Sequence, residues 1–192
     1  MHRFASNVNV CTGNNHNIII KPTMTTTAKL YTLNLSNTKT YLFATIFIVG
    51  NLLLPQLAHL VPQGGFIFLP IYFFTLIAAY KYGIHVGLLT AILSPLANSL
   101  LFGMPPVAVL PAIIVKSAIL AIAAALAAKH FGKVSLVGIL LAILAYQVIG
   151  TGVEWAMTQN FTAAMQDFRL GIPGLLIQLF GGYFVLKALA KI

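Results

Sequence analysis

Negative charge is almost absent from this sequence. Only two of its 192 residues are Asp or Glu, and charged residues of either sign make up 7% of the chain. Soluble domains carry roughly 25% charged residues, whereas 59% of this chain is hydrophobic. The composition therefore indicates a membrane protein. Two carboxylates are also too few for the usual intramembrane proton or sodium relay, which argues against an autonomous ion-coupled carrier.

The sequence also lacks the residues that redox and hydrolytic chemistry require. Its single cysteine, Cys11, excludes an internal disulfide and any Cys-x-x-Cys site. No Gly-x-Ser-x-Gly elbow, His-Glu-x-x-His pair or Walker A loop occurs. We therefore expect no enzymatic activity and no cofactor. The net charge of +9 comes from scattered basic residues, so we expect no nucleic-acid partner either.

Long apolar runs are abundant. A bilayer core requires about 20 apolar residues per helix, and six segments approach that length: 40–61, 66–80, 84–102, 107–128, 134–157 and 172–190. The second is short and contains Pro70, so we expect it to lie inside the bundle. The predicted fold is an all-α membrane protein, a bundle of six transmembrane helices.

The basic residues predict the orientation of these spans. Arg169 lies in an outer loop and Lys116 inside span four. The other nine fall on one side of the bundle: Arg3, Lys21, Lys29, Lys39, Lys81, Lys129, Lys133, Lys187 and Lys191. The positive-inside rule places both termini in the cytoplasm and the chain in the inner (cytoplasmic) membrane as a multi-pass protein.

Residues 1–39 differ in kind from the rest. They are rich in Asn and Thr and lack the basic and apolar regions of a signal peptide. We expect a flexible polar tail at 1–39, in which Met24 opens the functional chain, followed by a membrane domain at 40–192.

Prolines cluster between spans three and four. Pro105 and Pro106 fall in the outer hairpin, Pro111 in the first turn of span four, and Pro95 deeper in span three, where it is expected to kink or open the helix. Broken backbone at membrane depth is tolerated where it borders protein or a water-filled cavity. An outward-facing hollow and a simple loop between kinked helices are both compatible with this pattern.

Polar side chains gather in the outer half of the predicted bundle. Span five places Gln147, Thr151 and Glu154 on one helical stripe. Asn98, Glu154 and Gln178 are expected near the outer boundary, and Lys116 and Gln147 somewhat deeper, near the midplane. An ammonium at bilayer depth is costly, so Lys116 is expected to point inward to a partner. Either Lys116 pairs with Glu154 for structure, or Lys116 receives a ligand anion.

Two segments carry a resemblance to a known family. They are YFFTLIAAYKYGIHVGLLTAILSPLANSLLFGMPP, residues 72–106, and FRLGIPGLLIQLF, residues 168–180. Together they resemble the substrate-binding S components of energy-coupling factor (ECF) vitamin transporters over about residues 40–192. The resemblance implies a six-helix bundle that binds a vitamin from outside and docks on a membrane coupling subunit driven by two cytoplasmic ATPases. The family often has a glutamate where this chain has Lys116.

On this basis the sequence predicts high-affinity binding and uptake of a carboxylate-bearing vitamin or precursor, such as pantothenate, folate, biotin or lipoate. Lys116 would hold the anion, and Glu154 and Trp155 would meet the other end of the ligand. The amides expected to bind its polar edges are those of Asn98, Gln147 and Gln178. The alternatives are an accessory membrane protein whose polar residues join helices, and a stand-alone facilitator.

Overall fold

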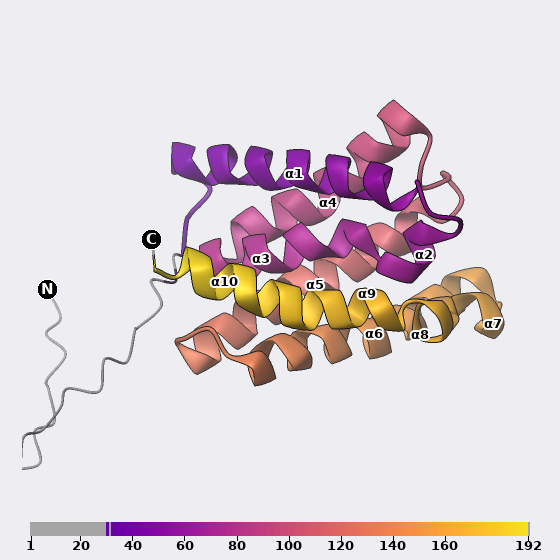
Figure 1. The fold of residues 1–192 in the computed structure, drawn as a ribbon. Helices are drawn as coiled ribbons and strands as arrows, with labels where there is room; N and C mark the ends of the chain where they lie inside the picture. Colours follow the sequence, from indigo (N-terminus) through magenta and orange to yellow (C-terminus); the bar gives the residue numbers. More distant parts are fainter. Residues whose placement is uncertain (1–29, 31, 192) are drawn as a thin grey trace, which may run out of the picture.

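The computed structural model describes residues 30 and 32–191 and is all-helical over that range (Figure 1). Six stretches of the described chain are long and apolar enough to cross a membrane. They are α1 (Thr38–Ala58); α2 (Gly64–Phe68), η1 (Pro70–Tyr72) and α3 (Phe73–Tyr82) together; α4 (Ile84–Phe102); α5 (Leu110–Phe131); α6 (Leu136–Thr158); and α9 (Ile172–Leu176), η2 (Ile177–Gly181) and α10 (Gly182–Leu189) together. Two short helices, α7 (Phe161–Ala164) and α8 (Gln166–Leu170), precede the last span. The predicted six-helix bundle is confirmed.

The second span is the centre of the bundle, as predicted, although at 19 residues it is no shorter than α4 or the last span. Of the residues in its apolar 18-residue window, 61% are buried inside the bundle, against 22% to 44% in the other five spans. Its helix breaks at Leu69, which has a left-handed φ of 46° and precedes Pro70. Beyond the break, α3 packs against α1, α4, α5 and α10.

The proline-rich hairpin follows the sequence pattern. Pro105 and Pro106 lie in the loop between α4 and α5, and Pro111 lies in the first turn of α5, where its missing N–H had no helical partner. By contrast, α4 continues through Pro95 as a single helix to Phe102.

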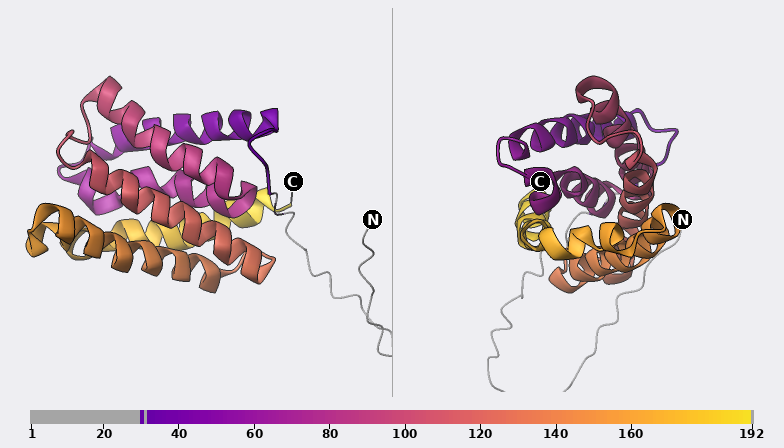
Figure 2. Two further views of the ribbon diagram at one scale, coloured as in Figure 1. Left: turned by 180° about the vertical axis from the view of Figure 1, so that it is seen from behind. Right: turned by 90° about the vertical axis from the view of Figure 1, so that its right-hand side faces the viewer.

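The two ends of the bundle differ in charge. The first residues of α1, the last residues of α3 and α10, and the α5–α6 connection lie at one end (Figure 1), together with Lys39, Lys81, Lys129, Lys133 and Lys187. We call it the basic end. The other end, the loop end, carries α2, the α4–α5 loop, α7 and α8 (Figure 1). An end-on view shows the α7–α8 segment crossing the loop end from α6 toward the last span (Figure 2).

The described part of the predicted tail is attached to the bundle. The Leu33 amide donates to the Tyr82 carbonyl over 3.2 Å, and the Thr40 hydroxyl donates to the Asn34 carbonyl over 2.6 Å. The chain is thus held from Leu33 onward, before α1 begins. The rest of the predicted tail, 1–29 and 31, lies outside the described residues.

Candidate functional site

Lys116 is buried where α5 packs against α6, with 3% of its surface exposed. Its aliphatic stem lies against Gly150, where a Cβ atom would sit 2.6 Å from Lys116 Cγ. Only glycine leaves room for the lysine stem at this point of α6. The stem crosses α6 one helical turn before Glu154 and carries the ammonium toward it.

Two carboxylates hold this ammonium. Lys116 Nζ is ion-paired with Glu154 Oε2, and it donates to Asp167 Oδ2 over 2.8 Å. Of the two alternatives left open for Lys116, the structure shows the pair with Glu154. We call these three residues the ion cluster. It contains both acidic residues of the chain and carries one positive and two negative formal charges.

Asp167 is the functional candidate that sequence reasoning missed, because it lies in the segment between two spans. Asp167 lies on α8, which packs against α9 at the loop end, and α9 packs against α2. A Cβ atom on Gly174 would lie 2.5 Å from the Phe68 carbonyl carbon and oxygen, so glycine allows the two backbones to touch. One feature of the sequence could have identified Asp167. The chain has only two carboxylates, so a buried ammonium has few candidate partners.

Gln147 and Thr151 lie on the same face of α6 as Glu154, with hydrogen-bonding capacity unused. Gln147 is 0% exposed, and neither atom of its side-chain amide has a hydrogen-bond partner among the described residues. The Thr151 hydroxyl is equally unpartnered there, at 6% exposure. Residues 147, 150, 151 and 154 share one face of α6, the face on which the Lys116 stem lies. This stripe was predicted from the sequence.

Gln178 is also buried at the α6 interface, but its amide is engaged. The Tyr146 hydroxyl donates to Gln178 Oε1 over 3.1 Å, and Gln178 Nε2 donates to the Leu69 carbonyl over 3.5 Å. Tyr72 packs on Tyr146 with ring centroids 5.1 Å apart. Gln178 lies in the π-helical turn η2, a local distortion common at functional sites. Tyr146 was not a sequence candidate, and Tyr72 was set aside because aromatic residues are common at membrane interfaces.

Asn98 lies in a different polar network, with no recorded contact to the ion cluster. Its Nδ2 donates to the Asn51 carbonyl over 2.8 Å, and Asn51 Nδ2 donates to Thr75 Oγ1 over 3.1 Å and to Ser94 Oγ over 3.3 Å. This network joins α1, α3 and α4, and it reaches α5 through Ser117, whose hydroxyl donates to Thr75 Oγ1 over 3.4 Å. Asn98 and Lys116 therefore have different hydrogen-bond partners.

Trp155 is turned away from the ion cluster. It is 51% exposed and makes an edge-on contact with Phe161, with ring centroids 5.7 Å apart. Adjacent residues of an α-helix point about 100° apart, so Glu154 faces the interior while Trp155 faces outward. The predicted contact of Trp155 with a ligand beside Glu154 has no support in this geometry.

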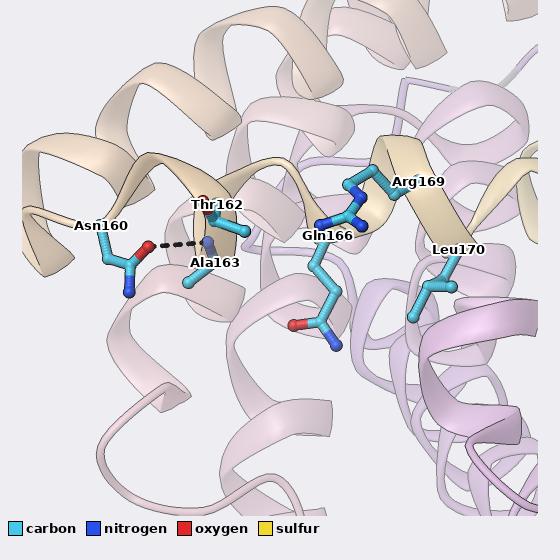
Figure 3. Close-up of a pocket in the computed structure, with 6 residues that line it drawn as sticks. All are labelled: Asn160, Thr162, Ala163, Gln166, Arg169 and Leu170. Atoms are coloured by element: carbon cyan, nitrogen blue, oxygen red, sulfur yellow. Dashed lines mark hydrogen bonds between the residues drawn. The ribbon is translucent and has the colours of Figure 1, made fainter.

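A pocket of about 350 Å³ opens at the loop end, lined by residues of α7, α8 and the residue before α7 (Figure 3). Its lining residues are Asn160, Thr162, Ala163, Gln166, Arg169 and Leu170. One short helix thus carries Gln166 and Arg169 into the pocket and Asp167 into the ion cluster. Within the described chain, His, Cys, Asp and Glu form no group of three that could hold a metal ion.

No family model, curated protein or solved structure matches the chain. The site itself therefore carries the functional argument. It offers charges and hydrogen-bonding groups at the loop end of an apolar bundle, a chemistry suited to binding a polar solute.

Proposed function

We propose that this chain is the solute-binding subunit of an ATP-driven uptake system, of the kind that ECF S components provide. It binds a small vitamin-like solute between α5, α6 and the α8–α9 segment. The basic end faces the cytoplasm and the loop end faces outward, in the cytoplasmic membrane. The observation that carries the proposal is the fully buried, unpartnered amide of Gln147 on the same face of α6 as Glu154.

A role in packing alone does not account for this amide. Buried polar groups in native proteins are hydrogen-bonded in the great majority of cases, and an orphaned group costs about 1–3 kcal/mol. In the Asn51–Asn98 network both Nδ2 groups have partners, and one oxygen, Asn98 Oδ1, has none among the described residues. Gln147 lacks a described partner at both its nitrogen and its oxygen, and a polar solute would supply them.

The energy for uptake must come from other subunits. The sequence has no Walker A loop and too few carboxylates for ion coupling. The proposed partners are a membrane coupling subunit and two cytoplasmic ATPases, which the family resemblance implies.

The second candidate is an accessory membrane protein. It is favoured by Asn51, whose side-chain nitrogen and oxygen both have protein partners, as expected of a residue that joins helices. A stand-alone facilitator is a third. A facilitator equilibrates solute across liposomes without an ATPase, whereas an accessory protein retains no solute.

The test is solute retention by the full chain in lipid nanodiscs. Wild type, Gln147→Leu and the control Gln56→Leu, a half-buried position on α1, are incubated with the low-molecular-weight fraction of a bacterial cell extract. After washing, mass spectrometry identifies what remains bound. Wild type and Gln56→Leu are expected to retain one solute, and Gln147→Leu to retain about tenfold less. Wild type that retains nothing would contradict the proposal.

A further inference from the structure

The ion cluster has an excess of negative charge. Its one ammonium is shared by two carboxylates, and these are its only recorded salt bridges in the described chain. The basic residue nearest to Asp167 in the sequence, Arg169, is exposed and lines the pocket at α7 and α8 (Figure 3). An uncompensated charge inside an apolar bundle is unfavourable unless something pairs with it.

The two carboxylates are less enclosed than the ammonium. The side chains of Glu154 and Asp167 are 17% and 13% exposed, against 3% for Lys116. The two acidic side chains thus keep some exposed surface, although Glu154 Oε2 is buried, while the lysine stem lies against Gly150. A solute entering from the loop end meets negative charge first.

The neighbouring groups suit a cation with hydrogen-bond donors. Gln147 Oε1 and Thr151 Oγ1 are buried acceptors without partners among the described residues.

Building on the proposed function, we infer that the solute places a positively charged hydrogen-bond donor against Glu154 and Asp167. The class comprises protonated amines, amidinium groups and cationic nitrogen heterocycles. The Gln147 amide and the Thr151 hydroxyl complete the contact.

This inference replaces the ligand carboxylate predicted at Lys116. That prediction needs an ammonium without protein partners, and the structure gives Lys116 two. A third carboxylate would enter a site that is already net negative and would meet like charges at close range.

The experiment repeats the retention assay with charge variants of the full chain in nanodiscs, using the same low-molecular-weight extract. Glu154→Gln and Asp167→Asn each remove one negative charge and keep the side-chain shape. Lys116→Met removes the positive charge and keeps an unbranched side chain of similar length. Lys133→Gln is the control, because it changes the net charge by one unit at an exposed position of the basic end.

The retained solute is expected to carry a cationic nitrogen. Glu154→Gln and Asp167→Asn are expected to lower its retention by about tenfold or more, because each weakens a charge-assisted contact. Lys116→Met is expected to retain it at least as well as wild type, and Lys133→Gln to match wild type. If Lys116→Met does not yield folded protein, the two carboxylate variants decide alone.

Two results would overturn the inference while leaving the proposed function intact. One is a retained anion that Glu154→Gln binds at least as well as wild type and Lys116→Met loses. The other is a solute of any charge whose retention neither carboxylate variant changes. Failure of wild type to retain any solute rejects the proposed function instead, so the two failures are distinguishable.

Discussion

Gln147 and Gln178 are chemically identical side chains in opposite situations. Both are buried in the interior of the bundle, at 0% and 1% exposure. Gln178 accepts from the Tyr146 hydroxyl, whereas no described residue bonds the Gln147 amide. The first stabilises the helices, and the second carries a desolvation cost that the proposed solute relieves.

Replacing these two residues by leucine should therefore shift stability in opposite directions. Without solute, Gln147→Leu is expected to raise the free energy of unfolding by about 1–3 kcal/mol, since it removes an unsatisfied amide. Gln178→Leu is expected to lower it by a similar amount, because the Tyr146 hydroxyl loses its acceptor. Thermal denaturation of the purified chain in detergent measures both. A loss of stability in Gln147→Leu would show that its amide has a partner.

Helical spacing predicted part of the candidate site. The stripe of Gln147 and Glu154 and the pairing with Lys116 follow from position along two helices. Asp167 could not be placed this way, because its position depends on how a loop folds back over the bundle. Spacing also does not distinguish between interior faces, so it did not predict that Asn98 would donate to the Asn51 carbonyl.

Among the elements, α8 and α9 link the ion cluster to the centre of the bundle. Through Asp167, α8 holds Lys116 of α5, and α9 lies against the broken start of the second span at Gly174. The sequence predicts a short second span through Pro70. It does not predict the break at Leu69, whose left-handed backbone is unusual for leucine and depends on contacts from distant segments.

The close approach at Gly174 has a matched comparison at Gly152. A Cβ atom on Gly174 would meet the Phe68 backbone at 2.5 Å, whereas one on Gly152 meets nothing within 4 Å. Gly174→Ala is expected to destabilise the chain by about 1–3 kcal/mol through overpacking. Gly152→Ala is expected to leave stability unchanged or raise it by about 0.5–1 kcal/mol. Thermal denaturation distinguishes them, and equal effects would contradict the packing of α9 on α2.

The ion pair to Asp167 should control the opening of the α7–α8 segment. Asp167→Asn is expected to increase amide hydrogen exchange across Phe161–Leu170 by about tenfold, because a charge-assisted hydrogen bond is weakened. Gln166→Ala, a neighbouring change on the pocket side, is expected to leave exchange near wild type. Exchange followed by mass spectrometry in nanodiscs measures both. Unchanged protection in Asp167→Asn would show that other contacts hold the segment.

For the whole molecule, hydropathy predicted the spans because the requirement for a bilayer-length apolar helix is local. How the spans pack against each other depends on contacts between distant residues, which hydropathy does not report. The separation of basic residues at one end gives the proposed orientation its support.

The orientation has a direct test in chains whose native Cys11 is replaced by serine. Thr162→Cys, at the loop end, is expected to react with a membrane-impermeant maleimide added to intact cells. Lys133→Cys, at the basic end, is expected to react only after permeabilisation; both positions are exposed. The reverse pattern would invert the proposed topology.

The ion cluster also constrains how the chain is synthesised. Lys116 leaves the ribosome before either of its partner carboxylates. The α5 segment therefore reaches the translocon with an ammonium whose partners have not yet been synthesised. A short connection separates α5 from α6, and Glu154 arrives only near the end of α6. We expect α5 and α6 to enter the lipid together as a helical hairpin, and the outer segment with Asp167 to complete the neutralisation last.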